Sequence, residues 1–316
     1  MTRRSSGRSA LAALTAVGAV GAAAAVWGFG IERHLYALRR HTVPILEPGS
    51  EPIRILHLSD LHMAPWQHRR QRWIASLVEL QPDLVVNTGD TLGHVQGLIG
   101  VRAAFEPFRG VPGLYVHGSN DLVAPSPRNP FTYFNGPSGE LREVGSVDTA
   151  ALDRYMDGLG WRSVDNASAV LRVRGHRVDA FGVGDAHREL DRLDLMPGLV
   201  DELREADSTD DTDPAPLTIG VAHAPYRRVL DSFTTLGADI LFAGHTHGGQ
   251  VRIPGSPSAL VANCDIPLDQ ARGMSTWTRS GRTVPLNVSA GLGHSIYAPV
   301  RFGCRPEASF ITLVPR

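Results

Sequence analysis

From residue 53 onward, short apolar runs alternate with longer segments whose apolar residues recur at helical spacing. Residues 53 to 59, 84 to 87 and 113 to 117 have the composition of buried strands. A helical pattern over residues 69 to 80 separates the first two strands, and another near residues 101 to 108 separates the second from the third. Because crossover helices connect parallel strands, this alternation predicts an α/β domain.

The second half of the chain continues this alternation after a predicted hairpin. Residues 168 to 173 and 177 to 183 are two strand-like stretches separated by a short Arg-Gly turn. Residues 217 to 222 and 240 to 243 are two further predicted strands, with a helical segment between them. The strands of both halves end in polar residues, so the site of an open α/β sheet is expected at these ends.

Two stretches lack the composition of a packed core. Residues 124 to 145 are rich in Pro, Gly, Asn and Ser, and a loop of this length is a candidate lid over a site. Residues 201 to 216 are acidic and rich in Ser, Thr, Asp and Pro. We predict that this second stretch is a solvated connector.

Residues 10 to 31 form an uncharged stretch of 22 residues near the N-terminus. About 20 apolar residues are enough to span a bilayer. The stretch is therefore interpreted as a transmembrane anchor or as the apolar region of an export signal. A buried core helix is less favoured, because the stretch is apolar on all sides.

The expected domain organisation follows from this segment. We assign residues 1 to 43 to the membrane anchor or export signal and residues 44 to 316 to the folded domain, which begins with a Pro-containing linker over residues 44 to 52. We predict a protein of the cell membrane with the folded domain on the extracytoplasmic side. Arginines flank both ends of the apolar stretch, so charge leaves the topology nearly undecided.

Composition adds little about partners. The 316 residues are 42% hydrophobic with a formal net charge of −1, so the chain has ample core material and no global field toward nucleic acid. No nucleic acid partner is expected. Cys264 and Cys304 are too few for a thiolate zinc site, although one disulfide between them remains open.

Metal-binding residue types gather at the ends of the predicted strands. Residues 243 to 250 read Ala-Gly-His-Thr-His-Gly-Gly-Gln, and in extended backbone the two histidines of such a motif would project from one face. Further donors follow the earlier strands. The candidate set is Asp60, His62, Asp90, Asn120, His223, His245 and His247.

The chemistry of this set points to two metal ions. Seven nitrogen and oxygen donors without a thiolate exceed the needs of one ion and suit two divalent ions such as Mn, Fe or Zn. A carboxylate can bridge two such ions, and Asp90 is the natural bridge.

The ordered motifs resemble those of the calcineurin-like metallophosphoesterase family, from residue 53 to about residue 313, and most resemble its bacterial membrane-associated branch. The resemblance implies a four-layer αββα sandwich of two mixed sheets flanked by helices. It also implies two metal sites that share Asp90. One ion is held by residues matching Asp60, His62, Asp90 and His247, and the other by residues matching Asp90, Asn120, His223 and His245.

The third motif departs from the family pattern, which reads Gly-Asn-His followed by Asp or Glu. Here residues 118 to 121 are Gly-Ser-Asn-Asp. Ungapped pairing places Ser119 at the ligand position, whereas a shift of one residue makes Asn120 the ligand and puts Asp121 where the catalytic histidine would stand. We favour the shift, because a neutral hydroxyl is a poor ligand beside an available amide oxygen. The usual histidine is missing in either register.

These residues predict a phosphoesterase in which a metal-bridging hydroxide attacks phosphorus. Asp121 is the candidate catalytic residue, and His187 and Arg301 are candidate substrate contacts. Since the domain follows a membrane segment, membrane-derived or lipid phosphodiesters are the expected substrates. The alternative is a metal-bound but catalytically weak or silent binding or regulatory protein at the membrane.

Overall fold

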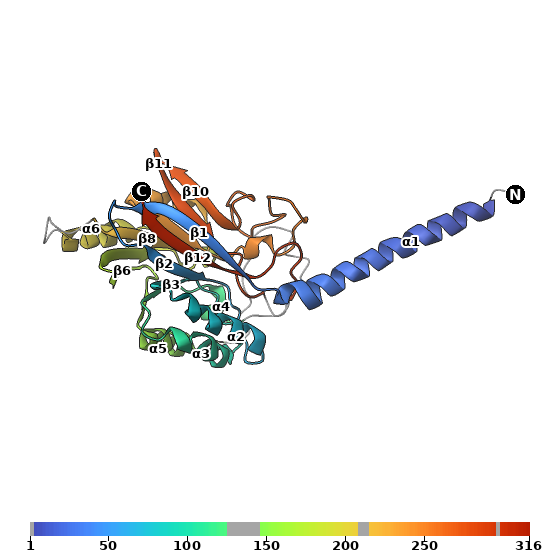
Figure 1. Ribbon diagram of the computed structural model, residues 1–316, viewed down its shortest axis with the longest axis horizontal. Helices are drawn as coiled ribbons and strands as arrows, with labels where there is room; N and C mark the ends of the chain where they lie inside the picture. Colours follow the sequence, from blue (N-terminus) through green and yellow to red (C-terminus); the bar gives the residue numbers. More distant parts are fainter. Residues whose placement is uncertain (1–2, 125–145, 208–214, 295–297) are drawn as a thin grey trace.

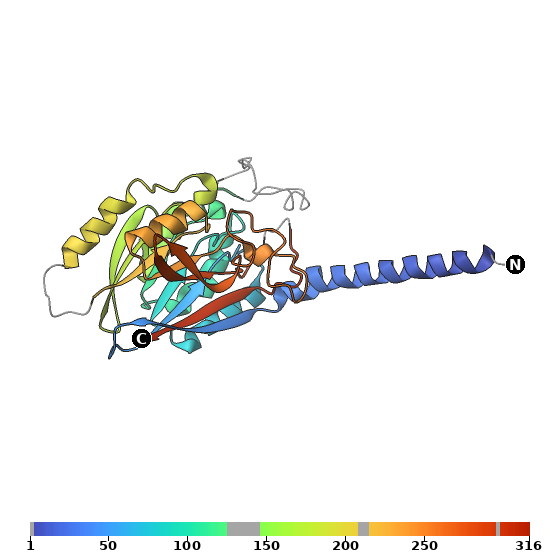
Figure 2. The same cartoon turned by 90° about the horizontal axis from the view of Figure 1, so that it is seen from above.

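The computed structural model describes residues 3–124, 146–207, 215–294 and 298–316. Two six-stranded sheets pack face to face, helices cover their outer faces, and one long N-terminal helix extends away from this body (Figures 1 and 2). The predicted four-layer αββα sandwich is confirmed.

The first sheet has the order β1-β12-β2-β3-β4-β5. Strands β2 to β5 are parallel, whereas β12 runs antiparallel to β2 and parallel to β1, so the sheet is mixed. Its strands are β1 (Ala37–Leu46), β12 (Glu307–Pro315), β2 (Ile53–Leu58), β3 (Leu84–Asn87), β4 (Gly113–Tyr115) and β5 (Trp161–Ser163).

The second sheet has the order β10-β11-β9-β8-β7-β6. Antiparallel hairpins form both of its edges around a parallel centre, so this sheet is also mixed. The hairpin predicted near residue 175 is the pair β6–β7. The strands are β6 (Ala167–Val173), β7 (His176–Gly182), β8 (Leu217–Val221), β9 (Ile240–Ala243), β10 (Gly273–Arg279) and β11 (Arg282–Val288).

Side chains alternate between the faces of each sheet, and this alternation builds three apolar layers. In β2, Ile55 packs between the sheets with residues such as Phe242 of β9, while Leu56 faces the helices of the first sheet. The helices over the first sheet are α2 (His68–Ser76), α3 (Gly97–Phe105) and α5 (Thr149–Leu159), and those over the second are α6 (Met196–Asp207) and α7 (Arg227–Leu236).

Strand β1 corrects the predicted start of the domain. Its register pairs Val43 with Leu313 and Pro44 with Val314, so the strand crosses the boundary that we placed between residues 43 and 44. The linker predicted over residues 44 to 52 is wrong in its first part. The strand was missed because it is an edge strand with exposed polar residues, where a proline is tolerated.

Two other segments bear on the sequence predictions. Helix α6 occupies Met196–Asp207, so the first part of the predicted acidic connector is helical, because its apolar residues pack on the second sheet. Residues 125–145 of the candidate lid lie outside the described residues. Cys264 and Cys304 are both free.

Helix α1 (Arg3–Val26) continues through a π-turn (Trp27–Ile31) and a 3-10 turn (Glu32–His34) into β1. Within the described chain, one helical span, Ala12–His34, is long and apolar enough to cross a membrane, with a mean hydropathy of 1.7. Only 6% of its most apolar part is buried. The span therefore shows its apolar side chains to the surroundings, which suits a membrane anchor or an export signal.

Candidate metal centre

The predicted ligands converge where the parallel strands of both sheets end. Asp60 and His62 follow β2, Asp90 follows β3, Asn120 follows β4, and the first sheet thereby supplies four of them. His223 follows β8 and the pair His245 and His247 follows β9 in the second sheet. All of these side chains are buried or nearly so. The site thus joins the two sheets at one edge of the sandwich.

At five of the predicted ligands the backbone adopts the left-handed conformation that non-glycine residues rarely adopt. Such a conformation costs on the order of 1–3 kcal/mol per residue and persists where the surroundings enforce it, as at functional sites. The extended backbone expected for the His245 and His247 pair is therefore wrong. Positive φ values occur at Asp60 (48°), His62 (42°), Asp90 (49°), His245 (65°) and His247 (48°).

One half of the site is formed by Asp60, His62 and His247. The Nε2 atoms of the two histidines lie 3.1 Å apart, and Asp60 Oδ1 lies 3.7 Å from His247 Nε2. One ligand atom from each residue lies within 4.8 Å of the others. A divalent cation is held by nitrogen and oxygen atoms at about 2.0–2.2 Å, so atoms spaced in this way can share one ion.

The other half contains His223, His245 and the carboxylate of Asp90. Asp90 Oδ2 lies 3.8 Å from His223 Nε2, and His245 Nδ1 lies 3.3 Å from the same nitrogen. The same Asp90 oxygen lies 3.5 Å from His62 Nε2 of the first half. A single carboxylate oxygen therefore stands between the two groups.

The residues fit divalent metal ions by an observation that is independent of the spacing. Asp60 Oδ2 accepts hydrogen bonds from Ser59 Oγ (2.6 Å) and His245 N (3.0 Å), whereas Oδ1 is buried without a hydrogen-bond partner among the described residues. The Nδ1 atom of His223 lies 2.7 Å from the carbonyl of Thr88, which leaves Nε2 free to face the site. A buried oxygen without a donor and an oriented imidazole are both satisfied by a cation.

Burial also prepares the histidines for metal binding. It lowers the pKa of His62 to about 4 and holds the pKa values of His245 and His247 well below the usual range, so all three are neutral at pH 7. Burial raises the pKa of Asp60 to about 7. It would also raise that of Asp90, but His223 and His62 outweigh it and lower the pKa. Neutral imidazoles beside carboxylates are the protonation states that metal ligands need.

A polar network beneath the site was not found from the sequence. Thr88 Oγ1 donates to Ser59 Oγ (2.6 Å), which in turn donates to Asp60. His57 Nε2 lies 2.9 Å from Thr88 Oγ1, and Asn287 lies 2.6 Å from the other ring nitrogen. The one indication in the sequence was that His57 occupies a position of β2 that faces the other sheet.

The third motif places Asn120 at the site. Its main-chain nitrogen donates to Asp90 Oδ1 (2.8 Å), and its side-chain amide donates to Asp90 Oδ2 (2.7 Å). Ser119 instead donates its hydroxyl to Asp185, a buried carboxylate. Burial by itself would lower the pKa of His223, but Asp90 and Asp185 help to outweigh it and raise the pKa to about 9. Asp185 is a polar residue of the site that sequence reasoning missed, although it ends a strand in the same way as the predicted ligands.

Asp121 does not face the metal ligands in the way that a proton donor requires. Its carboxylate is fully buried and accepts hydrogen bonds from the main-chain nitrogens of Leu92 (2.8 Å), Thr91 (3.1 Å) and Gly118 (3.1 Å). These bonds tie the third motif to the loop after Asp90. The placement argues against the predicted catalytic role, because a carboxylate engaged in this way is structural.

His187 and Arg301, the two predicted substrate contacts, differ in position. His187 is half-buried, its ring centroid lies 4.3 Å from that of His245, and its Nδ1 lies 3.0 Å from the hydroxyl of Tyr226. Arg301 is fully buried and donates to the carbonyls of Gly293 (2.6 Å) and His247 (2.8 Å). The predicted phosphate contact of Arg301 is therefore replaced by a contact to a ligand-bearing turn.

His117, the last residue before the third motif, forms ion pairs with two carboxylates. It lies 2.9 Å from Asp153 and also contacts Asp165 through its other ring nitrogen. Burial by itself would lower the pKa of His117, but the two carboxylates outweigh it and raise the pKa to about 10. The protonated side chain thus fixes β4 to its neighbours.

This pair of contacts predicts a pH-dependent stability. An unfolded histidine releases its proton near pH 6.5, so the stabilisation is complete below that pH and is lost as the pH rises through about 10. As the pH rises between these two values, the free energy of unfolding of the parent protein should fall. The slope should be steeper than that of His117→Gln by about 1.4 kcal/mol per pH unit. Urea unfolding of both proteins with a chelator present, at pH 7 to 9.5, measures the two slopes. Parallel slopes would contradict the charged pair.

Residues 53–249 match the sequence model of a family described as calcineurin-like phosphoesterase. The chain belongs to this family. The match extends from β2 to the turn that contains His247, so the calcineurin-like phosphoesterase domain includes all seven predicted ligands.

Two related proteins match this chain over most of their own length. The chain is 23% identical over 293 residues to phosphodiesterase YaeI of Escherichia coli (strain K12), with 91% of this chain and 93% of the relative covered. It is 24% identical over 293 residues to the uncharacterized metallophosphoesterase YkuE of Bacillus subtilis (strain 168), with 90% and 87% covered.

Solved structures are more distant. The NAD nucleotidase of Haemophilus influenzae matches with a TM-score of 0.46 and 12% identity, over 77% of this chain and 51% of that protein. The phosphopantetheinyl hydrolase of Mycobacterium tuberculosis matches with a TM-score of 0.38 and 14% identity, over 78% of this chain and 94% of that protein.

Proposed function

We propose that this protein is a dinuclear metal-dependent phosphoesterase and that it hydrolyses phosphodiesters of membrane-derived or lipid substrates. One observation carries the dinuclear part. Oδ2 of Asp90 lies within 3.8 Å of an imidazole nitrogen in each half of the site. A carboxylate between two groups of imidazole nitrogens is suited to bridge two ions.

Two divalent ions, when bound, would activate water and neutralise the charge that develops on the phosphoryl oxygens. Asp60, His62 and His247 would hold one ion, while Asn120, His223 and His245 would hold the other across Asp90. The fold supplies rigid placement, since every one of these residues follows a strand end. Mn, Fe or Zn fits the nitrogen and oxygen donors.

His187 would contact the substrate beside the second ion. Its ring lies against that of His245, and the bond to Tyr226 fixes its orientation. Because the third motif lacks the histidine usual in the family, His187 would donate a proton to the departing oxygen. Substrates with leaving groups that depart with little protonation should therefore react fastest.

The N-terminal helix supports a lipid or membrane-derived substrate. Its apolar span would place the domain at the surface of a bilayer on the extracytoplasmic side, and tethering raises the local concentration of membrane substrates. The similar protein of Escherichia coli carries the name phosphodiesterase.

The test uses full-length protein in detergent micelles, loaded in turn with Mn²⁺, Fe²⁺ or Zn²⁺. We expect hydrolysis of an aryl phosphodiester to be faster than that of the matching monoester, and we expect cleavage of phosphodiester lipids in vesicles. Preference for a soluble monoester that vesicles do not change would contradict the substrate class. If two metals bind but no ester is hydrolysed, the result would favour the alternative, a metal-bound binding protein. This alternative is motivated by the histidine that the third motif lacks.

A further inference from the structure

The segment Arg301–Cys304 lies between the end of the N-terminal helix and the turn that contains His247. On one side the segment donates hydrogen bonds to the helix end. On the other side it contacts the turn of residues 247 to 250. It thereby links the apolar helix directly to the metal-binding half formed by Asp60, His62 and His247.

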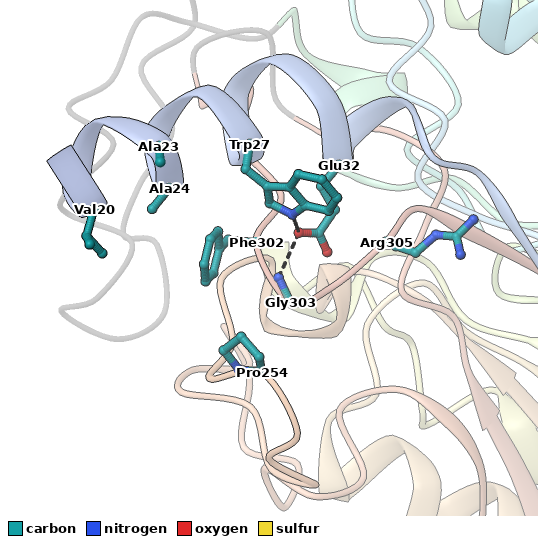
Figure 3. Close-up of a pocket in the computed structure, with 9 residues that line it drawn as sticks. All are labelled: Val20, Ala23, Ala24, Trp27, Glu32, Pro254, Phe302, Gly303 and Arg305. Carbon is teal, nitrogen blue, oxygen red and sulfur yellow. Dashed lines mark hydrogen bonds between the residues drawn. The ribbon is translucent and has the colours of Figure 1, made fainter.

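The helix end holds this segment through two residues. The carboxylate of Glu32 is only 4% exposed and accepts hydrogen bonds from the main-chain nitrogens of Gly303 (3.0 Å) and Cys304 (2.7 Å). The carbonyl of Gly28 accepts from Arg301 N (3.1 Å). Trp27 Nε1 donates to Glu32 Oε2 (2.6 Å) and fixes the carboxylate (Figure 3).

The segment in turn holds the ligand-bearing turn. Arg301 Nη1 donates to the carbonyl of His247 (2.8 Å), and Nη2 lies 3.2 Å from His247 Nδ1. Cys304 Sγ donates to the same carbonyl at 3.4 Å. Phe302 N donates to the carbonyl of Gln250 (3.1 Å). Both ends of the turn are thereby held from the same segment.

This turn needs external support because its backbone is unfavourable. Four consecutive residues have positive φ, and two of them, His247 (48°) and Gln250 (49°), are not glycine. Each such residue costs on the order of 1–3 kcal/mol and keeps its conformation only where neighbouring contacts enforce it. The His247 carbonyl accepts one hydrogen bond from Gln250 N within the turn (3.0 Å), and Arg301 and Cys304 contact it from outside the turn.

The contact between the helix end and the segment Arg301–Cys304 is bordered by an apolar groove. A groove of ≈ 650 Å³ runs between the helix and the loops of the body, with the helix side chains on one wall and Phe302 and Pro254 on the other (Figure 3). Gly28 is the buried residue of the π-turn, and a Cβ there would lie 3.1 Å from Val300 Cγ2 and 3.2 Å from the carbonyl oxygen of Arg301. The helix therefore approaches the segment closely, and a side chain at this position would press against Val300 and Arg301.

We propose that the end of the N-terminal helix is a positioning element of the metal centre: Glu32 and Gly28 hold Arg301–Cys304, which fixes His247. The inference rests on the proposed dinuclear function. The membrane segment is then a part of the catalytic domain's architecture as well as a tether. Loss of the Glu32 contacts should weaken the ion held by Asp60, His62 and His247 and spare the ion held by His223 and His245.

The experiment titrates Mn²⁺ into full-length protein in detergent micelles and follows the EPR signal of the free ion. Glu32→Gln keeps the size of the side chain but replaces one acceptor oxygen by a donor, and Gly28→Val inserts atoms against Val300 and Arg301. Each variant should bind one of two Mn²⁺ ions ~10–100-fold more weakly, the effect typical of residues that orient a metal ligand. Glu106→Gln, which removes an exposed carboxylate paired with Arg109, is the matched control and should bind like the parent.

The outcomes separate the two proposals. If the parent binds fewer than two ions, the dinuclear function itself is wrong. If the parent binds two and both variants bind both ions with parental affinity, the positioning role is wrong. Equal weakening of the two ions, together with a lower unfolding temperature, would indicate a general loss of stability and would also contradict it.

Discussion

Asp90→Asn should release both metals and reduce phosphoester hydrolysis by more than ~100-fold. Substitutions of residues that merely orient a metal ligand typically cost about 10–100-fold, and Asp90 lies between both halves of the site. The amide keeps the size of the side chain and removes the charge that two ions would share. Metal analysis after dialysis and a diester assay measure the two effects.

Asp194→Asn is the control for this change. Asp194 is exposed and pairs with Arg192 on the surface, so its removal should leave metal content and turnover unchanged. Full occupancy by two metals in Asp90→Asn, with parental turnover, would overturn the assignment of the site.

Gly118→Ala should disable the site although it removes no ligand. The added methyl would lie 2.3 Å from Asp90 Oδ1 and 2.7 Å from His223 Cε1, so both side chains must move. The φ of Gly118 is −106°, which alanine adopts freely, so the effect is steric alone. Overpacking of this kind costs about 1–3 kcal/mol of stability, and we expect loss of the ion shared by Asp90 and His223.

Gly158→Ala provides the matched comparison. No atom lies within 4 Å of a Cβ placed there, and the residue is in helix α5. Alanine should leave metal binding unchanged and raise the free energy of unfolding by about 0.4–1 kcal/mol, as expected in a helix. Thermal unfolding and metal analysis of both variants give the contrast. Normal metal content in Gly118→Ala would show that the loop yields to the methyl group.

Local patterns predicted an α/β domain and the convergence of the ligands, whereas the four-layer sandwich was implied by the resemblance to the family. Apolar runs identify buried strands, and the ends of parallel strands meet at one edge of a sheet. The proximity of Asp60, Asp90 and His223 could therefore be predicted from the sequence. Side-chain direction is not encoded in this way. Asp121 and Arg301 have the chemistry of site residues, yet their contacts depend on loops that only the folded chain brings together.

The edge strand β1 could not be predicted from the sequence pattern either. Strand β1 carries Arg39 and Arg40 on its exposed positions and contains a proline, so it lacks the composition of a buried strand. It is defined by its pairing with β12, which is distant in the chain. Local propensity cannot predict a strand whose partner decides its conformation.

The pairing of β1 with β12 also sets the order in which the molecule can be completed during synthesis. β12 lies between β1 and β2, so the first sheet stays open until Glu307–Pro315 has left the ribosome. At translation rates of about 5–20 residues per second, β1 waits on the order of tens of seconds for its partner. The exposed arginines of β1 protect this unpaired edge from association with other chains. A chain interrupted just before Glu307 would therefore carry its apolar helix and all seven predicted ligands, but not the strand that joins β1 to β2.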